Sequence, residues 1–210
     1  MRIAVLGATG WVGSTVVAEA KSRGHEVVAI VRDAAKLTAE GVTSRVYDLQ
    51  STADFAPVVA EADVVIASIG GRAAGNHEIV AKAAERLLTS LANSGKRLIW
   101  VGGAGSLEIA PGVALVTSPD FPAEYKDEAL AQGEALNVFR STKSKTPWTF
   151  VSPAAVLYPG DSEGEFRIGG DAFFTNSDGE SKISVTDYAK ALVDEAENAE
   201  HINQRISVAY

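Results

Sequence analysis

The sequence predicts an α/β protein built on a doubly wound parallel sheet. Along most of the 210-residue chain, short apolar runs alternate with segments of helical periodicity. The apolar runs lack an internal polar alternation, which is typical of parallel strands buried on both faces. Because right-handed crossovers leave few arrangements for alternating strands and helices, a doubly wound sheet is the expected topology.

Each element is placed by its apolar pattern and its terminal residues. Strands are predicted at residues 2–6, 26–31, 44–49, 63–69, 97–101, 148–152 and 205–209. Helices are predicted at residues 11–23, 77–93, 122–141 and 187–198, the first two ended by Gly24 and Gly95. A further helix, capped by Ser51, is expected after the third strand.

The sequence shows no internal repeat and no linker, so residues 1–210 are expected to form a single domain. Beyond residue 158 the pattern changes to glycine-rich loops and short apolar pieces. We expect residues 158–185 to form a small irregular C-terminal cap on the substrate side of the domain.

Composition excludes several classes of function. Hydrophobic residues make up 46% and charged residues 22% of the chain, as in ordinary soluble proteins. The net charge of -8 gives no support for binding nucleic acid or an anionic membrane. The absence of cysteine rules out disulfides and thiolate metal sites, and no apolar run approaches the roughly 20 residues of a membrane span. We find no secretion signal and expect a cytoplasmic protein.

The motif GATGWVG, residues 7–13, stands between the first predicted strand and the first predicted helix. In this setting Gly7 permits the tight turn, Gly10 lets a pyrophosphate approach the backbone, and Gly13 lets the helix pack on the strand. Free N–H groups at the helix start complete an anion site, to which Thr9, Trp11 and Val12 also belong. The motif therefore predicts a dinucleotide-binding Rossmann fold, the alternative being a tight turn without a ligand.

Arg32, at the end of the second strand, bears on the choice of cofactor. A carboxylate at this place usually binds the ribose 2′-hydroxyl of NAD, whereas an arginine accommodates the 2′-phosphate of NADP. Arg32 favours NADPH. If Asp33 were the ribose ligand instead, NADH or both cofactors would be used.

The glycine motif resembles that of the short-chain dehydrogenase/reductase superfamily, in the atypical NAD(P)H-binding branch that includes NmrA-like proteins and flavin or biliverdin-IXβ reductases. Four further stretches are similar to those of the NADH-flavin reductase family, so that the resemblance spans almost the whole chain. They are VGGAGSL (101–107), PDFPAEYKDEALA (119–131), WTFVSPA (148–154) and ISVTDYAKALVDE (183–195).

The resemblance implies a path for the cofactor along the strand ends. Adenine would meet Asp48 and Leu49, and its ribose would lie along Ser68, Ile69 and Gly70. The nicotinamide half would pass Gly102 and Gly103 and end beside Ser152, Pro153, Ala154 and Ala155. The alternatives are structural: Asp48 as a helix cap, Ser68 as a small buried residue and Pro153 as a strand end.

The tyrosine that usually protonates the substrate in this superfamily has a lysine four positions later. None of the five tyrosines here has that lysine, and Tyr125 is followed at this spacing by Ala129. Carbonyl reduction and sugar epimerase or dehydratase chemistry are therefore disfavoured. Hydride transfer to a flavin requires mainly that two rings be held face to face, since solvent can supply the proton.

The acceptor is expected between the loop at residues 103–125 and the segment 158–174. Ser106 and Tyr125 are the candidate catalytic residues, Ser106 as a hydrogen-bond donor to developing negative charge. Phe121, Tyr158 and Phe166 are candidates for sandwiching a planar acceptor, and Arg167 for a flavin phosphate. Ordinary packing of the aromatic residues is the alternative. His25, His77 and His201 are scattered, so we expect no metal site.

These observations predict an NAD(P)H-dependent reductase that passes hydride to a flavin (FMN or FAD) or to a similar planar acceptor, such as a quinone or linear tetrapyrrole. The alternative is a non-catalytic, NmrA-like protein that senses NAD(P). We expect a monomer or weak homodimer whose partners are small molecules, with no nucleic acid or membrane among them.

Overall fold

The computed structural model describes residues 1–51, 53–72 and 75–210. Its centre is an eight-stranded sheet in the order β10-β12-β8-β5-β4-β1-β2-β3. Neighbouring strands run parallel except for the pair β10 and β12. The strands are β1 (Arg2–Leu6), β2 (Glu26–Val31), β3 (Thr43–Val46), β4 (Val64–Ala67), β5 (Arg97–Val101), β8 (Trp148–Pro153), β10 (Arg167–Gly169) and β12 (Gln204–Ala209).

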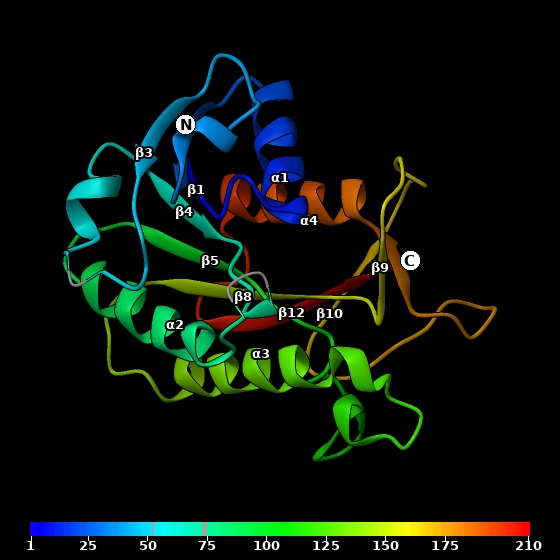
Figure 1. Ribbon diagram of the computed structural model, residues 1–210. Helices are drawn as coiled ribbons and strands as arrows, with labels where there is room; N and C mark the ends of the chain where they lie inside the picture. The colour runs from blue at the N-terminus through cyan, green and yellow to red at the C-terminus, as the bar shows by residue number, and fades with distance from the viewer. Residues whose placement is uncertain (52, 73–74) are drawn as a thin grey trace.

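Helices cover both faces of the sheet, which confirms the predicted doubly wound α/β fold. Figure 1 shows α1 (Trp11–Ser22) and α4 (Val185–Asn198) on one face, and α2 (Glu78–Ser90) and α3 (Ala123–Ser141) on the other. None of the helices in the described ranges is long and apolar enough to cross a membrane.

Alternation along the buried strands divides the core into two clusters. In β1, Ile3 and Val5 belong to the cluster beneath α1 and α4, whereas Ala4 and Leu6 belong to the cluster beneath α2 and α3. Aromatic rings fill the second cluster, where Phe139 of α3 packs against Trp100 with their ring centroids 5.5 Å apart. Both faces of the strands are thus apolar because both are covered.

The helix expected after the third strand, with Ser51 as its cap, is wrong. β3 ends at Val46, and the connection contains only a short 3-10 helix, Ala56–Val59, with Pro57 in its first turn. The carbonyls of Leu49, Ser51 and Ala53 accept hydrogen bonds from the Arg86 guanidinium of α2. These hydrogen bonds satisfy the carbonyls of the connection without a helix. Thr52, which the expected helix would have contained, lies outside the described residues.

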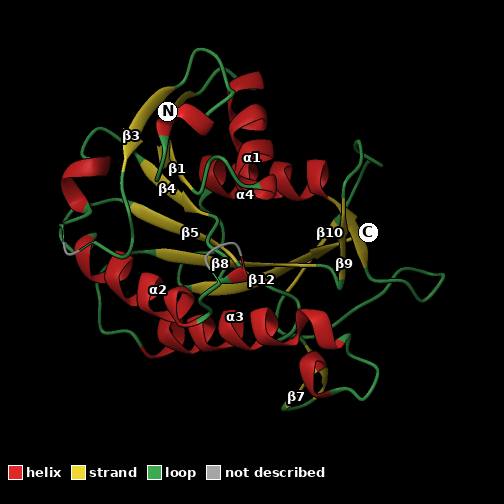
Figure 2. Cartoon of the chain, viewed as in Figure 1, coloured by secondary structure: helices red, strands yellow, loops and turns green. Residues whose placement is uncertain are grey.

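The C-terminal segment is less irregular than the sequence predicts. Its strand β10 joins the main sheet as an antiparallel edge, and β11 (Lys182–Ser184) pairs with β9 (Val156–Tyr158). Figure 2 shows these strands beside long loops at the end of the sheet away from β3. A small hairpin of β6 (Glu108–Ala110) and β7 (Val113–Ala114) follows β5.

Candidate cofactor site

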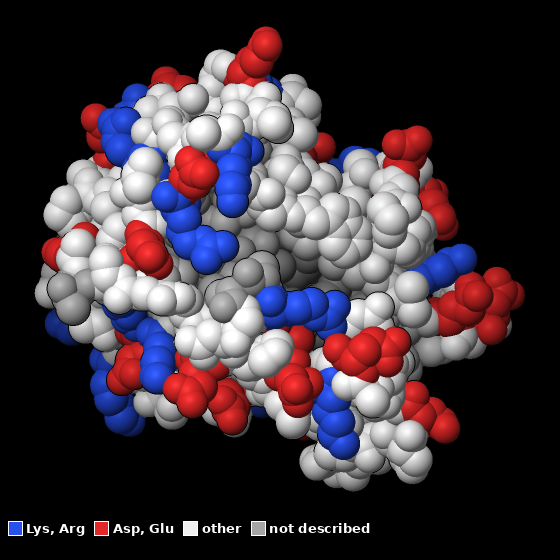
Figure 3. Space-filling model, in the orientation of Figure 1, with Lys and Arg blue, Asp and Glu red and all other residues white. Residues whose placement is uncertain are grey.

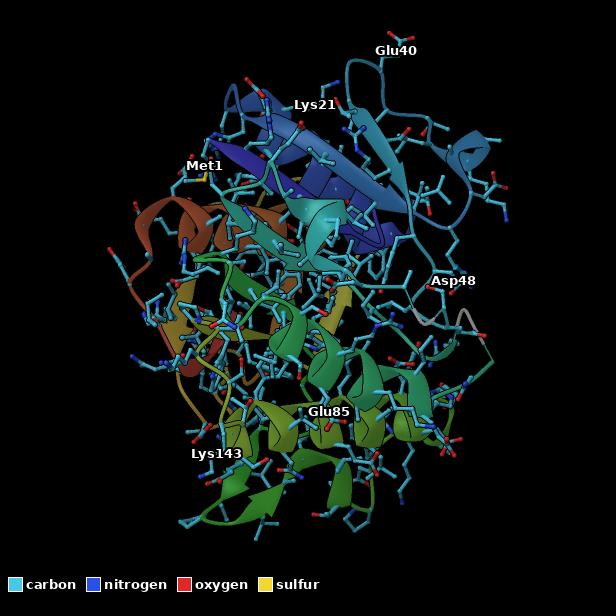
Figure 4. All side chains as sticks on the ribbon, turned by 90° about the vertical axis from the view of Figure 1, so that its left-hand side faces the viewer. Met1, Lys21, Glu40, Asp48, Glu85 and Lys143 are labelled. Carbon is cyan, nitrogen blue, oxygen red and sulfur yellow. The ribbon has the colours of Figure 1, made fainter. Side chains whose placement is uncertain are left out.

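The direction of the strand order reverses between β1 and β4. The chain proceeds outward from β1 through β2 to β3, and then returns to β4 on the other side of β1. In open α/β sheets a crevice forms at this point, outside the carboxyl ends of the strands. In Figure 4, Asp48 lies at this end of the sheet, opposite Met1, and Figure 3 shows a hollow in the face viewed, with Lys and Arg side chains beside it.

The glycine motif forms the turn from β1 into α1. Gly7 has φ +82°, and a Cβ at this position would lie 2.1 Å from the Ser68 carbonyl oxygen. A Cβ at Gly13 would lie 2.1 Å from the Gly7 carbonyl oxygen, so only glycine lets α1 pack so closely on the turn. A Cβ at Gly10 would meet only the Gly7 oxygen, at 3.2 Å, and would otherwise project into open space.

The first turn of α1 offers unused hydrogen-bond donors. Gly10 is the N-cap and has no side chain with which to cap the helix. The N–H groups of Trp11, Val12 and Gly13 have no carbonyl within the helix to which they can donate. Together with the helix dipole, these amides form a site for an anion such as a pyrophosphate.

A cavity of about 270 Å³ extends from this turn across the ends of β1, β2 and β4. Nine of the residues predicted to bind the cofactor line it, together with apolar side chains that include Ile30 and Ile79. The nine are Gly7, Thr9, Gly10, Arg32, Asp48, Leu49, Ser68, Ile69 and Gly70. The structure therefore brings together the residues expected around the adenosine half and the pyrophosphate.

Arg32 and Asp33 have different surroundings. Arg32 lines the cavity and is exposed. The Asp33 carboxylate instead caps the short 3-10 helix Ala34–Lys36, where its Oδ1 accepts a hydrogen bond from the Ala35 N–H at 3.0 Å. Of the two residues, only Arg32 is among those that line the cavity.

The chain matches the protein family described as NAD(P)H-binding over residues 7–199. It belongs to the NAD(P)H-binding family. The uncharacterized protein YwnB of Bacillus subtilis is 41% identical over 216 aligned positions, which cover 99% of this chain and 98% of YwnB.

Two solved structures of similar size extend the comparison. One is a Streptococcus pneumoniae protein provisionally named an NADH-flavin reductase, with 37% identity, TM-score 0.91, and coverage of 100% of this chain and 99% of that chain. The other is a Bacteroides thetaiotaomicron protein provisionally named an epimerase, with 35% identity, TM-score 0.89, and coverage of 100% and 96%. The predicted resemblance to the NAD(P)H-binding branch is confirmed.

The residues predicted for the nicotinamide half of an NAD(P)H cofactor lie at the ends of β5 and β8, outside the cavity described above. A Cβ at Gly102 would lie 2.1 Å from the Phe150 ring, so packing alone requires glycine there. At Gly103 a Cβ would lie 3.2 Å from the Cβ of Gln132 on α3. Ser152 is buried, and its Oγ accepts a hydrogen bond from Arg205 at 3.3 Å. After it come Pro153, buried Ala154 and exposed Ala155.

Helix α3 supplies two site residues that the sequence did not reveal. Glu128 accepts hydrogen bonds from the backbone N–H groups of Gly71 and Arg72, each at 2.9 Å. Gln132 donates to the Ile69 carbonyl at 2.8 Å and accepts from the Trp100 indole at 2.9 Å. Glu128 and Gln132 are four residues apart, so the sequence could have shown that they share one face of the helix. Only the fold shows that this face contacts the chain that leaves β4.

The two predicted catalytic residues have opposite exposures. The Ser106 hydroxyl oxygen is buried, and among the described residues it has no hydrogen-bond partner. It cannot donate to an acceptor in open space while the loop keeps this conformation. Tyr125, at the start of α3, is 51% exposed, and the Arg72 guanidinium lies 4.8 Å from its ring centroid.

The four residues predicted to bind the substrate are dispersed over the C-terminal cap and the loop before α3. Phe166 packs partly buried against the core, and Phe121 is half-buried in the loop. The Arg167 guanidinium donates to the carbonyls of Thr175 and Tyr210, each at 2.7 Å. Desolvation, with the neighbouring Glu163 and Tyr210, raises the pKa of Tyr158, so this phenol stays protonated at neutral pH.

Proposed function

We propose that the protein is an NAD(P)H-dependent reductase that passes hydride to a flavin or to another planar conjugated acceptor. The observation that carries the proposal is that α3 lacks the usual pair of a tyrosine and a lysine four positions later. Ala129 stands where the usual lysine would follow Tyr125, and a Cβ at Gly105 would lie 2.6 Å from the Ala129 Cβ. Ala129 thus packs closely against the loop at Gly105.

The chemistry suits such a site. A bound nicotinamide would supply one hydride, which carries both electrons of the reduction, and the reduced flavin would take one proton from water. The protein needs only to hold the dinucleotide through α1 and the cavity and to align the two rings. The similarity to the streptococcal protein provisionally named an NADH-flavin reductase supports a flavin as acceptor.

We propose NADPH as the preferred cofactor. Arg32 borders the cavity, whereas Asp33 is engaged in capping a short helix. A guanidinium can make charge-assisted hydrogen bonds to a 2′-phosphate, which a neighbouring free carboxylate would oppose.

Turnover tests the proposal directly. The purified protein is mixed with NADPH and one acceptor (FMN, FAD or a quinone). The absorbance of the reduced nicotinamide at about 340 nm is then followed. Oxidation of NADPH above the rate without protein is expected. The Gly170→Ala variant should react like the wild type, because a Cβ there meets no atom within 4 Å. The absence of turnover with all of these acceptors would contradict the proposal.

A second candidate is a non-catalytic sensor of NAD(P). The buried Ser106 hydroxyl favours it, because that side chain is then not available for catalysis. A sensor would bind NADP⁺ and NADPH in a titration but oxidise no NADPH in the assay above.

A further inference from the structure

We propose that Glu128 of α3 is a positioning residue that sets cofactor affinity. Its carboxylate holds the segment 68–72, which follows β4 and forms one wall of the nucleotide cavity. This inference rests on the cofactor-binding part of the proposed function and does not depend on the acceptor.

The carboxylate binds two consecutive backbone amides of a segment remote in sequence. Oε2 accepts from the Gly71 N–H and the Arg72 N–H at 2.9 Å each, and Oε1 lies 3.2 Å from the same Gly71 nitrogen. The Glu128 side chain is only 23% exposed. Hydrogen bonds from amides to a partly buried carboxylate are stronger than those between neutral groups.

Gln132 supports the same arrangement one turn further along α3. Its amide nitrogen donates to the Ile69 carbonyl at 2.8 Å and to Glu128 Oε1 at 3.3 Å. The Trp100 indole N–H fixes the Gln132 oxygen at 2.9 Å. One face of α3 therefore binds the segment at Ile69, Gly71 and Arg72.

The segment has little freedom to find other partners. A Cβ at Gly71 would lie 2.5 Å from the Cα of His77, so the backbone is packed tightly against the start of α2. His77 Nδ1 is buried at 3.2 Å from Glu128 Oε2 and forms no hydrogen bond within the described residues. If the carboxylate were removed, the N–H groups of buried Gly71 and exposed Arg72 would lose their acceptor.

The same segment borders the cofactor cavity. Ser68, Ile69 and Gly70 line it, and the Ser68 carbonyl oxygen occupies the space that a Gly7 Cβ would need. In Figure 1 the chain leaving β4 descends across the open edge of the sheet toward α2 and α3. Gly71 therefore adjoins the cavity wall at Gly70 and is three residues from Ser68, which contacts the glycine turn.

The test is an NADPH titration of the full-length Glu128→Ala variant, followed by nicotinamide fluorescence. Its Kd should rise about tenfold, because two hydrogen bonds to a charged group are lost. Acetate should restore much of the affinity by occupying the two freed amides, whereas chloride at equal ionic strength should not. Glu134→Ala, on an exposed position of the same helix, is the matched control and should bind as the wild type does.

Glu128→Gln provides a second variant should the alanine variant fail to fold. It keeps one acceptor oxygen and should give an intermediate Kd. If the folded Glu128 variants bound NADPH with the wild-type Kd, the inference would be overturned. It would also be overturned if the Kd of Glu128→Ala were raised but acetate did not lower it. Since binding is measured, a wild type that binds NADPH but reduces no acceptor would contradict the proposed function alone.

Discussion

At Gly7, Gly10 and Gly13 the absence of a side chain serves three different purposes. Gly7 adopts a left-handed conformation and lies against the Ser68 carbonyl. Gly13 allows α1 to pack on the turn, and Gly10 leaves open space at the helix start. The spacing of the motif predicted the tight turn at Gly7 and the close packing at Gly13, because both follow from local strand-turn-helix geometry.

Alanine substitutions at Gly10 and Gly13 should affect NADPH binding and the stability of the fold differently. In Gly10→Ala the new Cβ meets one oxygen at 3.2 Å, so the fold should persist while NADPH affinity falls at least tenfold. In Gly13→Ala the Cβ would lie 2.1 Å from a backbone oxygen, and unfolding free energy should fall by roughly 2–3 kcal/mol as well. Urea melts and NADPH titrations measure both quantities. Equal losses of stability in the two variants would be inconsistent with these roles.

Arg32 should determine the preference between the two nicotinamide cofactors. In Arg32→Ala the Kd for NADPH should rise by about ten- to a hundredfold, since a charge-assisted phosphate contact is lost. The Kd for NADH should change little, and Arg45→Ala, an exposed control on β3, should affect neither. A parallel loss of affinity for both cofactors would assign Arg32 a role other than 2′-phosphate binding.

The surroundings of two residues, Ser106 and Glu128, could not be predicted from the sequence. Ser106 has a suitable side chain in a suitable loop, yet its hydroxyl is buried. Glu128 has no motif of its own, and its importance arises from the amides of Gly71 and Arg72, more than 50 residues away in the chain. Side-chain direction and long-range contacts of this kind depend on tertiary packing.

Among the elements, strands and capped helices agree best with the predictions. β5 has the predicted bounds, Arg97–Val101, because an unbroken apolar run leaves little choice. The helix expected at Ser51 is wrong, and the carbonyls of Leu49 and Ser51 instead accept hydrogen bonds from the Arg86 side chain of α2. The sequence around Ser51 does not show that a side chain from another helix will donate hydrogen bonds to its carbonyls.

Helix α4 is joined to the C-terminal cap through Asp187, which is fully buried. The carboxylate accepts from the Ser162 hydroxyl and the Tyr210 hydroxyl at 2.6 Å each, and from the Glu163 N–H at 2.8 Å. Burial alone would raise the pKa of Asp187. The hydrogen bonds from Ser162 and Tyr210, with those from Lys190 and the Glu163 amide, outweigh it and lower the pKa.

A lowered pKa makes the fold sensitive to acid. The stability that Asp187 contributes is complete above the unfolded-state pKa of about 3.9 and is lost as pH falls below it toward the folded-state pKa. Urea midpoints of the wild type should therefore fall steeply below about pH 4. Asp187→Asn should be less stable at neutral pH and should show a shallower acid dependence. Asp127→Asn, exposed on α3, is the control, and an Asp187→Asn profile parallel to the wild type would refute the linkage.

For the whole molecule, alternation of strands and helices was sufficient to predict the doubly wound sheet and the edge of the sheet at which the candidate cavity forms. It did not predict β10, whose three residues, Arg167–Gly169, join the sheet only because β12 presents a free edge. The nine predicted residues that line the cavity could be found from the sequence because they stand at strand ends in fixed order. The acceptor half depends on loops and on the cap, whose placement follows from contacts between distant segments.

We propose that the carboxyl edge of the sheet binds NAD(P)H with its pyrophosphate on the first turn of α1. A crystal structure of the protein with NADP⁺ tests it most directly. We predict the pyrophosphate against the amides of Trp11, Val12 and Gly13, the adenosine in the cavity beside Arg32, and the nicotinamide near the ends of β5 and β8. A dinucleotide bound elsewhere, with the glycine turn empty, would contradict this account.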